Sequence, residues 1–180
     1  MRSKSCGATS PGSPTDRLRR LPALPMKIRF LWPGKTRQPS LRDLVAFHAG
    51  RIGALIPFEI VETAEARGVA EKFGDRILDI EARGLEKQLK DDYIVCLSAD
   101  GREMTSEGLA AWLGQRAAGP ERTIAFVVGG FLGLHRRIAD RADLRLSLSR
   151  MTFSHELSRV VLAEQIFRAI SIMKGRQYAK

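Results

Sequence analysis

The chain has 180 residues and a formal net charge of +10 at pH 7, with 44% hydrophobic and 28% charged residues. This length and composition are typical of one soluble globular domain, of the size of an ordinary α/β domain and long enough to bury a hydrophobic core. They exclude a chain of several domains. No apolar run approaches the roughly 18 residues that a membrane-spanning helix needs, so the sequence predicts no transmembrane segment.

Residues 1–25 differ in composition from the rest of the chain. They are rich in Ser, Pro, Gly and Arg, lack a periodic apolar pattern, and contribute +4 to the net charge through five basic residues and one acidic residue. The segment also lacks the apolar stretch of a secretory signal. We expect either a disordered basic extension or an artefact of an upstream start site, followed by one domain over residues 26–180.

The first half of that domain alternates strand and helix patterns. Lys27–Trp32 is a predicted strand, and Ser40 is a predicted cap of the next helix. The apolar positions of that helix recur at helical spacing and include His48, which we interpret as a partly buried packing residue. Phe58–Val61 is a second predicted strand, and Asp75–Leu89 a helix with a polar face.

The second half continues the alternation. Tyr93–Ser98 is a predicted strand that ends in a turn at Ala99-Asp100-Gly101, and a helix starting at Thr105-Ser106-Glu107 is expected to reach Ala118. Thr123–Val128 has the continuous apolarity of a strand covered on both faces. The pattern predicts an α/β fold with a mostly parallel sheet and helices on both faces.

The last predicted helix, His155–Lys174, carries apolar residues on more than one stripe. It is therefore expected to be buried on two sides, either at the centre of a monomer or between its own sheet and a second subunit.

Glycines follow the strand at Thr123–Val128 directly, in the run Gly129-Gly130-Phe131-Leu132-Gly133. Glycines let backbone groups approach a ligand closely, and ligands of open α/β sheets lie beyond the carboxyl ends of the strands. The run matches neither the dinucleotide nor the P-loop motif. We expect a site between this turn and the segment Leu144–His155, although such a turn is often only a tight connection.

Charge and cysteine content restrict the partners and the compartment. A basic chain favours a polyanionic partner such as RNA, although charge alone is a modest argument. The two cysteines, Cys6 and Cys96, give no disulfide framework or zinc site, which fits a reducing cytoplasm.

Several longer strings carry a resemblance to a known family. They are Met26-Lys-Ile-Arg-Phe-Leu-Trp-Pro-Gly-Lys35, Val95-Cys-Leu-Ser-Ala-Asp-Gly101, Val127-Val-Gly-Gly130, Leu146-Ser-Leu-Ser-Arg-Met-Thr-Phe-Ser-His-Glu-Leu157, Arg159-Val-Val-Leu-Ala-Glu-Gln-Ile-Phe-Arg-Ala169 and Lys174-Gly-Arg-Gln-Tyr-Ala-Lys180. Together they resemble the RlmH family of SPOUT-class methyltransferases over residues 26–180. The resemblance implies a homodimer with a SPOUT-type α/β knot, a trefoil knot in the C-terminal part. It also implies transfer of a methyl group from S-adenosyl-L-methionine to N3 of a pseudouridine in large-subunit (23S) ribosomal RNA, without a metal ion.

The resemblance also assigns site residues. The cofactor is expected among three loops, at Leu97, Gly129, Gly130, Leu148, Ser149, Arg150, Met151, Thr152 and Phe153. The RNA side, where catalysis occurs, is expected to include His155, Tyr178 and Lys180. Taken alone, the apolar members of these sets fit core packing, and His155 fits a polar residue at the start of a helix.

Three departures from the family pattern leave alternatives open. Ala179 stands where the family has histidine, Ser154 replaces a proline, and Phe131-Leu132 replaces smaller or polar residues. The missing histidine favours a noncatalytic RNA- or ribosome-binding protein with the same fold. The bulkier Phe131-Leu132 favours a SPOUT methyltransferase that acts on another RNA.

Overall fold

The computed structural model describes residues 26–120 and 123–176. The extension 1–25 and the predicted site residues Tyr178 and Lys180 lie outside these ranges, as does Ala179.

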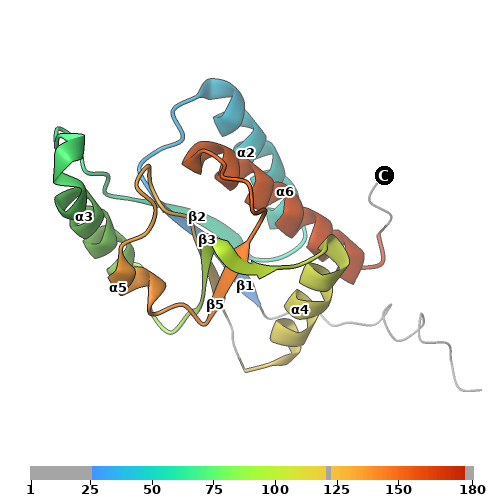
Figure 1. Ribbon diagram of the computed structural model, residues 1–180. Coiled ribbons are helices and arrows are strands. Elements are labelled where there is room, and N and C mark those ends of the chain that lie inside the picture. Colours follow the sequence, from blue (N-terminus) through green and yellow to red (C-terminus); the bar gives the residue numbers. More distant parts are fainter. Residues whose placement is uncertain (1–25, 121–122, 177–180) are drawn as a thin grey trace, which may run out of the picture.

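Five strands form one sheet in the order β2-β1-β4-β3-β5, and each neighbouring pair is parallel (Figure 1). They are β1 (Lys27–Pro33), β2 (Phe58–Thr63), β3 (Tyr93–Glu103), β4 (Thr123–Val127) and β5 (Leu144–Ser147). The apolar side chains alternate between the two faces, as a sheet covered on both sides requires: Phe30 and Trp32 face the larger core, whereas Leu31 faces the smaller one.

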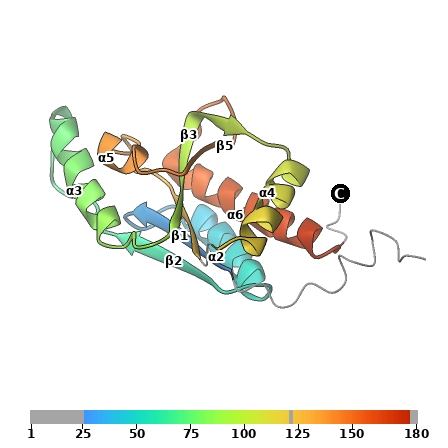
Figure 2. The same cartoon turned by 90° about the horizontal axis from the view of Figure 1, so that it is seen from below.

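Helices cover both faces, as the sequence predicted (Figure 2). The larger core lies under α2 (Pro39–Gly53), α4 (Ser106–Ala118) and α6 (His155–Met173), and the smaller one under α3 (Gly74–Glu86) and α5 (Arg136–Ala139). A single 3-10 turn, η1 (Glu71–Phe73), precedes α3.

Helix α6 packs against both α2 and α4 of its own chain. Ten of its nineteen residues are buried, so the two-sided burial expected for this helix is confirmed. Because neighbouring helices already account for that burial, the pattern does not by itself require a second subunit.

The α/β class and the parallel sheet are confirmed, but three local predictions are wrong. Ser40 lies inside the first turn of α2, whose cap is Gln38, because Pro39 already occupies the first helical turn. The segment Leu144–His155, interpreted as a loop beside the site, begins with the strand β5. Strand β3 continues to Glu103 instead of ending at Ser98.

The extension of β3 contains an interruption. Leu97 and Arg102 both pair with Leu146 of β5, so Ser98–Gly101 are displaced from the ladder between them. The trefoil knot is not evident in the described chain and stays a prediction of the resemblance.

Candidate functional site

A cavity of about 760 Å³ opens at the carboxyl ends of β3, β4 and β5. Residues from the displaced β3 segment, the glycine turn after β4 and the loop after β5 line it, and His155 and Ser158 of α6 close it. The carboxyl ends of parallel strands are where open α/β sheets bind ligands, so this cavity is the candidate site.

The displaced segment of β3 forms one wall through Ser98, Ala99 and Asp100. Its last residue, Gly101, packs on β5 so closely that a Cβ atom there would lie 2.8 Å from backbone atoms of Arg145 and Leu146. Glycine is therefore what allows the chain to rejoin the ladder. The hydroxyl of Ser98 donates a hydrogen bond to Asp100, which lowers the pKa of that carboxyl and keeps it ionised.

The glycine turn after β4 forms the second wall. The N–H of Gly133 donates to the carbonyl of Gly130 at 3.0 Å, and Gly133 has a φ of +84°, a conformation that favours glycine. A Cβ atom at Gly129 would overlap the backbone of Gly133 itself. The glycines therefore close the turn on itself, in addition to opening a surface toward a ligand.

The loop after β5 forms the third wall with Leu148, Ser149, Met151, Thr152 and Phe153. The N–H of Met151 donates to the Ser149 hydroxyl at 3.0 Å, which fixes the backbone of the loop. Met151 is 76% exposed and Phe131, across the cavity, is 65% exposed. Both side chains are therefore available to pack against an apolar part of a ligand.

Ser154 fixes the junction of this loop with α6. Its hydroxyl accepts a hydrogen bond from the N–H of Leu157 at 3.3 Å, as a helix N-cap does. The serine that departs from the family pattern therefore has a structural role of its own.

The variant Ser154→Ala is expected to lower the free energy of unfolding by about 1 kcal/mol, because the first turn of α6 loses its cap. Urea denaturation of both proteins measures the difference. The variant Ser158→Ala is the control, because its hydroxyl donates back to the Ser154 carbonyl and caps no N–H. An equal loss in both variants would contradict the capping role.

His155 lines the cavity at the first turn of α6. Burial, followed by the nearby Arg159 guanidinium, lowers the pKa of its imidazole. A lowered pKa favours the neutral imidazole, which can accept a proton.

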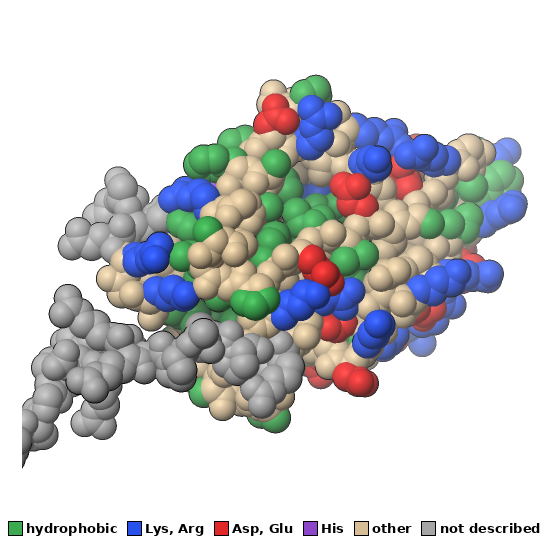
Figure 3. Space-filling view, turned by 180° about the vertical axis from the view of Figure 1, so that it is seen from behind, with side chains coloured by type: hydrophobic (Ala, Val, Ile, Leu, Met, Phe, Trp, Pro, Cys, Tyr) green, Lys and Arg blue, Asp and Glu red, His purple; other side chains and the backbone are tan. Residues whose placement is uncertain are grey.

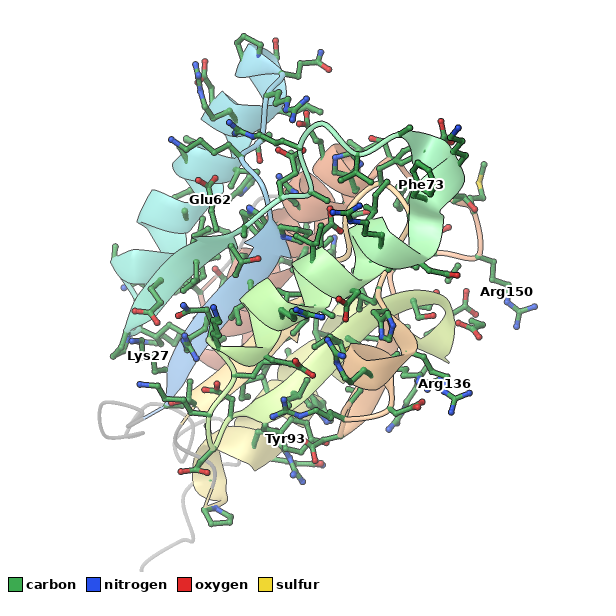
Figure 4. All side chains as sticks on the ribbon, turned by 90° about the vertical axis from the view of Figure 1, so that its left-hand side faces the viewer. Lys27, Glu62, Phe73, Tyr93, Arg136 and Arg150 are labelled. Carbon is green, nitrogen blue, oxygen red and sulfur yellow. The ribbon has the colours of Figure 1, made fainter. Side chains whose placement is uncertain are left out.

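Eight of the nine residues expected at the cofactor line this cavity together: Leu97, Gly129, Gly130, Leu148, Ser149, Met151, Thr152 and Phe153. Arg150 does not line the cavity; its exposed side chain points outward and pairs with Glu103 at 3.3 Å (Figure 4). His155 joins the cavity, whereas Tyr178 and Lys180 lie outside the described residues.

Sequence reasoning missed Ser98, Asp100 and Arg145 as cavity residues. Asp100 was assigned to a simple turn, and no pattern in a single sequence indicates a displaced segment within a strand. The alternation of Leu144, Leu146 and Leu148 was the available signal for β5, which brings Arg145 to the site.

Comparisons with known proteins identify the family of this chain. A family described as "Predicted SPOUT methyltransferase" matches residues 26–179. The chain belongs to the SPOUT methyltransferase family.

Curated relatives of this SPOUT methyltransferase carry a more specific name. A protein of Geobacter metallireducens, "Ribosomal RNA large subunit methyltransferase H", is 38% identical over 154 residues, which cover 85% of this chain and 98% of the relative. A protein of Clostridium beijerinckii with the same name is 33% identical over 159 residues, covering 86% of this chain and all of the relative.

Solved structures share the fold at low sequence identity. A "Probable Methyltransferase" from Bordetella pertussis superimposes with a TM-score of 0.53 at 14% identity, covering 82% of this chain and 98% of that one. A "putative methylase family protein" from Neisseria gonorrhoeae gives 0.50 at 17% identity, covering 82% and 84%. These structures support the fold alone.

The described residues provide neither a metal site nor a membrane span. Within residues 26–120 and 123–176, no group of three or more His, Cys, Asp or Glu side chains is placed to hold a metal ion. Among the helices of the same ranges, none is long and apolar enough to span a bilayer.

Proposed function

We propose that this SPOUT methyltransferase uses S-adenosyl-L-methionine to methylate N3 of a pseudouridine in large-subunit ribosomal RNA. The observation that carries the proposal is the convergence of eight expected cofactor residues on one cavity, in a chain 33–38% identical to rRNA large subunit methyltransferases H along almost their whole length.

The residues present fit the cofactor. A cavity of about 760 Å³ lies within the usual range for ligand sites, about 300–1,000 Å³. Leu148, Met151 and Phe153 would hold the adenine, and backbone groups of the glycine turn would read its edge. Asp100 and Arg145 also line the cavity, and their opposite charges match the ammonium and carboxylate of the methionine end.

When bound, S-adenosyl-L-methionine supplies a methyl group on a positively charged sulfur. The walls of the cavity orient the reacting groups and exclude water, which such a transfer needs more than a strong nucleophile. The pseudouridine N3 must lose its proton, and the neutral imidazole of His155 is the described group best placed to accept it. Tyr178 and Lys180 are proposed to act on the same RNA side.

Basic side chains favour an RNA partner. Lys and Arg side chains are spread over the face in Figure 3, interspersed with acidic ones. Arg136 and Arg150 are highly exposed and project from one edge of the molecule (Figure 4), and the segments that carry them adjoin the cavity. Such side chains can neutralise phosphates.

The same proposal includes a cytoplasmic homodimer with the methyltransferase domain at residues 26–180 and an extension at 1–25. Exposed apolar side chains on two packed helices support the dimer: Leu44 and Phe47 of α2, and Leu157 of α6.

Transfer of tritiated methyl groups tests the function. Ribosomes from cells that lack the gene should accept about one methyl group per large-subunit RNA, and digestion of that RNA should yield 3-methylpseudouridine. Incorporation into another RNA, or at another nucleotide, would contradict the proposed target.

A noncatalytic RNA-binding protein is the second candidate, because Ala179 stands where the family has histidine. We expect Ala179→His to raise the single-turnover rate about tenfold, a partial return of the roughly 100- to 10,000-fold typical of acid–base help. Cofactor affinity should not change. If the natural protein is active and Ala179→His is no faster, position 179 handles no proton. If the natural protein is inactive and Ala179→His is active, the noncatalytic function of the natural chain is supported.

A further inference from the structure

A buried carboxyl group lies behind the candidate site and takes no part in the proposed transfer. Glu81 of α3 is only 7% exposed. The backbone N–H of Ala66 donates a hydrogen bond to its carboxyl, but the Oε2 atom has no partner among the described residues. Since an unsatisfied buried polar atom destabilises the folded protein, its retention calls for an explanation.

The glycine turn lies directly against this carboxyl. A Cβ atom at Gly130 would lie 2.5 Å from Glu81 Oε2 and 3.0 Å from Oε1. Gly130 also lines the cavity, so the carboxyl of Glu81 contacts a residue of the cavity wall. The absent side chain of Gly130 is what leaves room for the carboxyl.

Two charged groups face Glu81 from other elements: Glu65 from the segment after β2, and Arg159 from α6. Burial, followed by repulsion from Glu65, raises the pKa of the Glu81 carboxyl, while Arg159 opposes that rise. The hydrogen bonds of Arg159 go elsewhere, to Pro33 and Thr36. The rise extends the protonated carboxyl to higher pH than in a free glutamate, and that form carries one donor and one acceptor.

We propose that Glu81 is a positioning residue: in its protonated form it donates through Oε2 to a backbone carbonyl of the Gly129–Gly133 turn and holds that turn in its ligand-binding shape. Oε2 is the carboxyl oxygen without a partner among the described residues, so it is the atom available to donate. The identity of the ligand rests on the proposed function, whereas the contact between Glu81 and the turn does not.

Calorimetry with S-adenosylhomocysteine tests the ligand-binding effect. Glu81→Ala should weaken binding about tenfold, because a buried hydrogen bond is lost. Glu81→Gln should bind within about threefold of the natural protein, because an amide keeps one donor and one acceptor. The KM for RNA should be unchanged in both. Glu86→Ala, on the same helix but paired with Arg137, is the control and should bind normally.

The pH dependence separates positioning from a purely structural role. As the pH rises through the raised pKa of the Glu81 carboxyl, the natural protein loses the protonated form, so its affinity should fall relative to that of Glu81→Gln. Glu65, Arg159 and His155 are present in both proteins, so their titration largely cancels in the ratio. A ratio that does not change with pH would overturn the proposal, as would natural affinity in Glu81→Ala.

A double-mutant cycle tests the contact without any ligand. Gly130→Ala should lower the melting temperature in the natural background, where its new methyl group meets the carboxyl, and should lower it much less when Glu81 is alanine. Additive effects would overturn the contact. If the natural protein binds no S-adenosylhomocysteine but the cycle shows coupling, the proposed function fails while the support of the turn by Glu81 stands.

Discussion

Gly129→Ala is expected to abolish detectable binding of S-adenosylmethionine and S-adenosylhomocysteine, a loss of at least about 100-fold in affinity. The added methyl group overlaps the backbone of Gly133. Backbone atoms cannot rotate away as a flexible side chain can, so the turn must open. Opening it separates Gly129 and Gly130 from the other two walls of the cavity. Isothermal titration calorimetry measures the loss.

Gly114→Ala is the matched control for this substitution. Gly114 lies inside α4 and a Cβ atom there would meet nothing within 4 Å, so the change should stabilise the helix by about 0.5–1 kcal/mol and leave binding unaltered. A Gly129→Ala protein that binds the ligand with natural affinity would show that the turn is not part of the cofactor site.

Arg159→Met is expected to reduce the free energy of unfolding by about 2–4 kcal/mol. Arg159 is 1% exposed, donates to the Pro33 carbonyl at 2.8 Å and to Thr36 Oγ1 at 3.1 Å, and lies over the Trp32 ring. Methionine fills much of the same volume but leaves both acceptors without a donor. Removal of a buried charge recovers part of the loss, which is why the expected effect is not larger.

Urea denaturation measures this change, and exposed Arg141→Met should stay within about 0.5 kcal/mol of the natural protein. Because Arg159 joins α6 to the loop after β1, His155 should also lose its fixed position, and methyl transfer should fall even where the protein remains folded. A variant of natural stability would show that the hydrogen bonds of Arg159 add nothing net to folding.

Two walls of the site are each formed by residues that are adjacent in the sequence, and these walls could be predicted. The glycine turn and the loop from Leu148 to Phe153 are local strings, and a resemblance assigns them residue by residue. The start of α4 at Thr105-Ser106-Glu107 was also predicted, because its capping residue Thr105 acts on a backbone N–H only three residues away.

The contributions that bring distant residues together could not be predicted. Glu81 meets Gly130 across a separation of 49 positions, and its pattern in the sequence is that of an ordinary helical glutamate. Asp100 reaches the cavity because β3 pairs twice with Leu146, and this register depends on the partner strand. Such contacts are set by tertiary packing, which a single sequence does not encode in a local pattern.

In a regular strand the same residues must both pair with the neighbouring strand and present side chains to the site. The displaced segment Ser98–Gly101 separates these two requirements. Pairing with β5 resumes at the residue where it stopped, Leu146, so of the displaced residues only Gly101, which packs on β5, is tied to the register of the sheet. The side chains of Ser98, Ala99 and Asp100 can therefore change without moving β5, or the loop that β5 leads into. This wall of the site is free to acquire a new ligand preference at little cost in folding, whereas the glycine turn opposite it is fixed by its own backbone.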